Sequence, residues 1–146
     1  MNEREAIADA VAERWLARTI DSYPEAARAS LRNVSDPFRN PAGFALKENL
    51  KALSRELLGA MDKHAIERAM DEIVRLRVLQ SPGEVPSFIG DLRVVVAEMA
   101  APVAALPADR IDVLLRMEAE KFASCRAQIE MLRQKEQRLR AQWEAQ

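Results

Sequence analysis

The last third of the sequence carries one regular pattern, in which mostly apolar positions recur at alternating steps of four and three residues. The positions are Ile111, Leu115, Glu118, Phe122, Cys125, Ile129, Leu132, Glu136, Leu139 and Trp143. Because an α-helix has about 3.6 residues per turn, these steps keep all ten side chains along one side of a single helix. This seam would be ~48 Å long, whereas a domain of ~100 residues has a radius of gyration of ~13 Å. The last helix is therefore predicted to extend beyond the body on which it packs.

The seam divides the chain into two parts. We predict a helical, sensor-like bundle over residues 1–106 and a long amphipathic helix over residues 107–146, whose first half completes the bundle. The second half would extend to a protein partner and contact it through Phe122, Ile129, Leu132, Leu139 and Trp143. An ordinary long helix that only covers the core is the alternative interpretation.

The charges beside the seam indicate what kind of partner would fit. From residue 121 onward the flanking positions are Lys121, Arg126, Gln128, Arg133, Lys135, Arg140 and Gln142, so every charged one is basic. Two copies of this helix would bring basic residues together in either orientation, which opposes self-pairing. An acidic helical partner is therefore predicted, and a homodimer would use the helical body or the first half of the helix instead.

Prolines divide the rest of the chain into short segments with helical periodicity. The predicted helices cover residues 3–20, 24–31, 42–58, 63–79, 86–101 and 107–144. No run alternates apolar and polar residues for long enough to predict a strand. The predicted fold class is all-α, a helical bundle with a long protruding C-terminal helix.

A stiff corner precedes the third predicted helix. Asn40 can cap this helix, and Pro41 can occupy its first position, where the missing N–H has no intrahelical partner in any case. Phe38 lies between this pair and Asp36-Pro37, so we predict that its ring fixes the corner onto the core. The substitution Phe38→Ala would then destabilise the protein by roughly 3–5 kcal/mol.

The fourth predicted helix ends in residues 73–79, which are apolar on nearly every side and predict the centre of the bundle. Arg75 and Arg77 lie in this segment, and a buried guanidinium must find a carboxylate, a carbonyl or an anionic ligand. One interpretation is a structural ion pair, with Asp36, Glu72 or Asp91 as the carboxylate. The other is a small-molecule or anion site formed by Arg75, Arg77 and Gln80.

Groups suited to catalysis or metal binding are scarce in this sequence, which has one histidine and one cysteine. His64 falls in the first turn of a predicted helix without a placed partner, and Cys125 is expected to act as a small hydrophobe in the seam. We therefore predict no catalytic residue, no metal site and no cofactor, haem included. The protein is predicted not to be an enzyme.

Composition limits the partners and the compartment. The net charge of −1 and the pI near 5.9 give no basic surface for nucleic acid. The most apolar stretch, Val94–Leu106, is interrupted by Glu98 and Pro102 and is shorter than the ~20 residues that a membrane helix needs. The first ten residues lack the apolar region of a secretory signal, and a single cysteine suits a reducing compartment. A cytoplasmic protein that binds neither nucleic acid nor membrane is predicted.

Several short motifs, in order, resemble the amino-terminal domain of RsbRD-type (RsbT) co-antagonists. They are Trp15, Tyr23-Pro24, the stretch DPFRNPAG from residue 36, and the stretch IVRLRVLQSPGEVPSFIGDLR at residues 73–93. The resemblance covers about residues 10–100. Carried over one by one, the motif positions are Trp15, Tyr23, Phe38, Asn40, Pro41, Arg77, Gln80 and Phe88.

The resemblance implies a globin-like, haem-free sensory module of bacterial stress signalling. In that family the module precedes a sulfate-transporter and anti-sigma-antagonist (STAS) domain, for which the sequence to Gln146 leaves no room. The expected function is therefore non-enzymatic regulation through protein–protein interaction with separate proteins. The alternatives are a ligand or anion sensor near Arg75 and Arg77, and a structural adaptor of a larger complex, for instance a redox complex.

Overall fold

All regular secondary structure in the described part of the chain is helical. The computed structural model describes residues 2–32, 38–80, 87–99, 103, 106 and 108–145, without the side chains of residues 30 and 78–80. The helices are α1 (Glu3–Asp21), α2 (Glu25–Arg32), α3 (Pro41–Leu58), α4 (Lys63–Gln80), α5 (Phe88–Glu98) and α6 (Ala108–Glu144). Each overlaps a helix expected from the sequence, so the predicted all-α fold class is confirmed.

Local capping explains where α3 begins. The Asn40 side chain accepts a hydrogen bond from the Gly43 amide (2.9 Å), and Pro41 is the first helical residue. The Asn40 amide group also donates to the carbonyl of Leu31 (3.1 Å), which the sequence did not indicate. A single buried asparagine therefore caps α3 and ties it to the end of α2.

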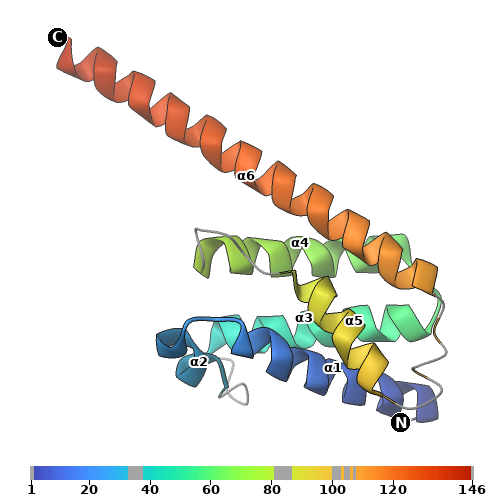
Figure 1. Ribbon diagram of the computed structural model, residues 1–146. Helices are drawn as coiled ribbons and strands as arrows, with labels where there is room; N and C mark the ends of the chain where they lie inside the picture. Colours follow the sequence, from blue (N-terminus) through green and yellow to red (C-terminus); the bar gives the residue numbers. More distant parts are fainter. Residues whose placement is uncertain are drawn as a thin grey trace.

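Five of the helices form a closed ring. Helix α1 contacts α3 and α5, α3 contacts α4, α4 contacts α6, and α6 returns to α5, while α2 packs on α1 and α3 (Figure 1). One stripe of leucines on α3 faces into this ring, since Leu46, Leu50, Leu53 and Leu57 are at most 2% exposed. The apolar interior of the ring is the hydrophobic core of the body.

Helix α6 belongs to the body only over its first half. Its buried side chains are Ile111, Leu114, Glu118 and Phe122, and every residue from 126 to 145 is exposed. Figure 1 shows the helix passing α4 and continuing away from the body to the C-terminus. Phe122 therefore lies in the protein's own core, and its assignment to the partner-binding surface was wrong.

The prediction that Phe38 packs on the core was also wrong. Its side chain is 94% exposed, although Asn40 and Pro41 form the expected helix start beside it. The observed start of α3 is the Asn40 cap followed by Pro41, and it does not involve burial of the Phe38 ring. The preceding Asp36-Pro37 pair lies outside the described residues.

This exposure reverses the expected effect of a substitution at Phe38. Phe38→Ala should change the unfolding free energy by less than ~0.5 kcal/mol, as is usual for exposed side chains. Urea midpoints measure this, and Leu50→Ala in the core, expected to lose ~2–5 kcal/mol, is the matched comparison. A loss above ~2 kcal/mol for Phe38→Ala would show that the ring packs against the body after all.

The apolar end of α4 is less enclosed than its sequence indicated. Ile73, Val74 and Arg77 are buried, but Glu72 and Arg75 are exposed. The reason is that α4 packs on α3 and α6, which leaves the side carrying Glu72 and Arg75 open to solvent. Only one of the two arginines therefore needs a buried partner.

Candidate functional site

Arg77 lies at the centre of a buried polar cluster between α1, α4, α5 and α6. Arg77 is only 2% exposed, and its guanidinium lies 5.1 Å from the centre of the Tyr23 ring and 6.0 Å from the centre of the Phe88 ring. One guanidinium nitrogen, Nη2, also lies 3.4 Å from the hydroxyl oxygen of Ser22. Such cation–π contacts stabilise a guanidinium that is removed from water.

Glu118 brings a carboxylate from α6 into the same cluster. One of its oxygens accepts a hydrogen bond from the Ser87 hydroxyl (2.5 Å), and the other accepts from the amides of Phe88 (2.9 Å) and Ile89 (3.2 Å). These amides open α5, whose N-terminus favours negative charge. Burial nevertheless raises the pKa of Glu118, against the opposing effects of these hydrogen bonds and of Arg77.

Asp91 is the second carboxylate that interacts electrostatically with Arg77. Burial raises the pKa of Asp91, and the charges of Arg77 and Arg18 act in the opposite direction. Asp91 also forms an ion pair with Arg18 at 3.5 Å. Asp91 and Glu118 both interact electrostatically with this buried guanidinium, which favours the ion-pair interpretation of Arg77 over an anion-binding pocket.

Aromatic packing links this cluster to the first helix. The Trp15 ring is stacked on Phe88 with centroids 6.2 Å apart, and Phe88 meets Phe122 edge to face at 6.4 Å. The indole N–H of Trp15 donates to the Phe88 carbonyl at 2.6 Å.

The structure brings together some of the predicted site residues and separates others. Trp15, Tyr23, Arg77 and Phe88 meet around the buried cluster, whereas Phe38 and the Asn40-Pro41 pair lie at the start of α3. The side chain of Gln80 lies outside the described ones. Arg75 is exposed and therefore does not join Arg77.

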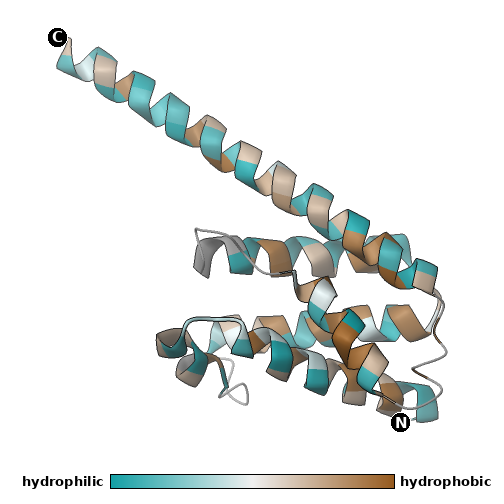
Figure 2. Ribbon diagram, viewed as in Figure 1, coloured by the Kyte–Doolittle hydropathy of each residue, from teal (hydrophilic) through white to brown (hydrophobic). Residues whose placement is uncertain are grey.

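The projecting half of α6 is the second candidate site. Its exposed apolar side chains are Ile129 (36%), Met131 (68%), Leu132 (67%), Leu139 (50%) and Trp143 (80%). Figure 2 shows hydrophobic bands separated by hydrophilic stretches along the projecting part of this helix. Apolar side chains that lie exposed on a projecting helix are suited to contact with another molecule.

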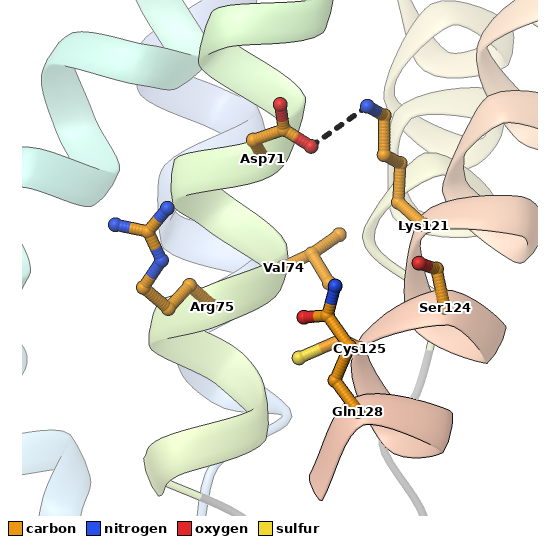
Figure 3. A pocket seen from close by; sticks show the side chains of 7 residues that line it. All are labelled: Asp71, Val74, Arg75, Lys121, Ser124, Cys125 and Gln128. Carbon is orange, nitrogen blue, oxygen red and sulfur yellow. Dashed lines mark ion pairs between the residues drawn. The ribbon is translucent and has the colours of Figure 1, made fainter.

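A groove of about 280 Å³ lies where α6 separates from α4 (Figure 3). Its lining is Asp71, Val74 and Arg75 from α4, and Lys121, Ser124, Cys125 and Gln128 from α6. Lys121 closes one end through an ion pair with Asp71 at 2.8 Å, which raises the pKa of the lysine. Figure 3 shows the Arg75 guanidinium pointing away from α6, so the apolar floor of the groove is Val74 and Cys125.

The remaining reactive side chains form no evident centre. His64 is exposed in the first turn of α4, where its amide donates to the Asp62 carboxylate at 3.0 Å, and Cys125 is half-buried. Within the described ranges no group of three or more His, Cys, Asp or Glu side chains could hold a metal ion. No helix in the described part of the chain is both long and apolar enough to cross a membrane.

No protein-family model, curated protein or solved structure matches this chain.

Proposed function

We propose that this protein is a non-enzymatic regulatory module that acts by protein–protein interaction through the projecting half of α6. The observation that carries this proposal is the row of exposed apolar side chains, above all Leu132, Leu139 and Trp143, on a helix that has left its own core. Hydrophobic burial against another protein would stabilise both the helix and the complex.

The buried cluster gives this helix a connection to the body. Glu118 lies on α6 and accepts hydrogen bonds from the first amides of α5, and Arg77 of α4 interacts with it electrostatically. A change in the packing of the bundle would therefore move the base of the projecting half. This is the arrangement expected of a sensory module whose output is a helix.

The kinship with RsbRD-type co-antagonists remains part of the proposal. The motif residues Trp15, Tyr23, Arg77 and Phe88 come together in space, which supports a shared core and hence a globin-like, haem-free bundle. From the same resemblance we propose that the protein is a cytoplasmic component of bacterial stress signalling. The electrostatic interaction of Arg77 with Asp91 and Glu118 supports this function better than an anion sensor.

Photo-crosslinking tests the proposed interaction surface. A photoreactive amino acid at position 132 or 139 should yield a discrete crosslinked protein in the host's cells, because both side chains are exposed on the proposed interface. Positions 134 and 141 lie on the opposite side of the same helix and should yield none. Equal crosslinking from both sides, or no crosslinking at 132 and 139, would contradict the proposal.

Truncation provides a matched test on the purified protein. A chain ending at Ala127 keeps Phe122, the last buried residue of α6, and every described residue that it loses is exposed. We expect its unfolding free energy to fall by less than ~1 kcal/mol, while the crosslinked partner is no longer bound. A body that unfolds on truncation would assign the projecting half a structural role instead.

A further inference from the structure

The groove between α4 and α6 continues onto one particular face of the projecting helix. At about 3.6 residues per turn, the α6 residues that line the groove are followed along the same line by a set of exposed side chains. This set is Met131, Leu132, Lys135, Leu139, Gln142 and Trp143. We call it the groove face, and Cys125 and Gln128 join it to the groove.

The groove face differs in charge from the rest of the helix. The projecting half has three acidic residues, Glu130, Glu136 and Glu144. Glu130 pairs with Arg133 (3.6 Å), and Glu136 pairs with Arg140 (2.8 Å), so both arginines lie beside carboxylates of their own helix. Glu130 and Glu144 lie on the opposite side of the helix, and Glu136, at roughly 70° from the line of the groove face, is already paired with Arg140.

The cations at the groove face lack such compensation. Lys135 lies on this face and Arg138 lies at its edge, and among the described residues neither has a carboxylate within ion-pair distance. The face therefore combines four exposed apolar side chains with uncompensated positive charge. A second copy using the same face would bring cation to cation, which opposes self-association.

Resting on the proposed function, we infer that the partner is an acidic amphipathic helix of another protein that lies along the groove face with one end in the groove. From Cys125 to Trp143 this surface is about 27 Å long, which matches about five helical turns. The apolar side chains of the partner would cover Leu132 and Leu139, and its carboxylates would meet Lys135 and Arg138. Ser124 and Gln128 supply polar contacts at the groove.

Two synthetic helices of about 20 residues test this inference, one with glutamate and one with lysine beside the same leucine stripe. The glutamate peptide should bind at least about tenfold more tightly at low salt, and the difference should shrink as salt is added. The charge reversal Lys135→Glu/Arg138→Glu should invert this preference. Arg133→Glu/Arg140→Glu makes the same charge change on the self-paired side and should leave the preference in place.

Cys125 reports on the groove directly, because it is the single cysteine of the chain. The glutamate peptide should slow its alkylation by iodoacetamide severalfold, and the lysine peptide should not. The inference fails if the peptides bind equally, or if neither one protects Cys125.

Two other results identify a different occupant and would also overturn the inference. One is binding to vesicles of phosphatidylserine and phosphatidylcholine through Trp143, which indicates a membrane surface. The other is a dimer in light scattering that Leu132→Asp/Leu139→Asp dissociates, which indicates a second copy. If crosslinking at positions 132 and 139 captures a partner that is not an acidic helix, the proposed function survives and only this inference fails.

Discussion

Replacing Glu118 by alanine is expected to destabilise the protein by about 3–5 kcal/mol, because it removes one carboxylate from a buried charge cluster. The variant loses the acceptor of the Ser87 hydroxyl and of the Phe88 and Ile89 amides, and Arg77 stays buried with less compensating charge. Urea unfolding followed by circular dichroism measures the loss. A loss below ~1 kcal/mol would mean that the cluster contributes little to the fold.

The variant Glu118→Gln separates charge from shape. Its side-chain carbonyl can still accept from one of the α5 amides, so we expect a smaller loss than for alanine. Its pH dependence should also change. Burial raises the pKa of Glu118 in the folded protein above its usual value of 4.5. The protonated side chain therefore contributes to the unfolding free energy fully below pH 4.5, and this contribution is lost as the pH rises through the folded-state pKa. Glu118→Gln should remove this part of the decline in stability with rising pH. The part due to Asp91, whose pKa is also raised, should remain.

The sequence predicted those parts of the fold that local interactions decide. The Asn40-Pro41 start of α3 and the buried leucine stripe of that helix both follow from neighbouring residues. The exposure of Phe38 could not be predicted in this way, because it depends on where the rest of the chain lies rather than on the adjacent prolines. Arg75 and Arg77 are two residues apart and so point to different sides of α4, one to solvent and one to the core.

The position of Glu118 in the apolar seam was a sequence signal for the buried cluster, and the sequence-based prediction did not use it. A carboxylate there predicts a buried cation, which Arg77 supplies. Phe122 was misassigned because the seam continues unchanged through the point where α6 leaves the body. Steps of four and three average 3.5 residues, so on a straight helix the seam drifts by about 20° every seven residues. The sequence pattern alone therefore located neither the end of the core nor the groove face.

The second large effect is expected for Trp15→Ala, with a loss of about 3–5 kcal/mol of unfolding free energy. The indole is fully buried, stacks on Phe88, and donates its N–H to the Phe88 carbonyl. Alanine would leave a large cavity between α1 and α5 and remove that hydrogen bond. Trp15→Phe keeps a ring in the site, so it should lose only about 1–2 kcal/mol and remain folded if the alanine variant does not.

Fluorescence can follow Trp15 alone, because the only other tryptophan is Trp143, which is 80% exposed. In a Trp143→Phe background, emission from the buried indole should be blue-shifted and should move to the red on unfolding. The complementary Trp15→Phe variant reports Trp143, whose emission should already resemble that of a solvated indole in the folded protein. Equal emission maxima for the two variants would contradict the burial of Trp15, and with it the packing of α1 against the start of α5.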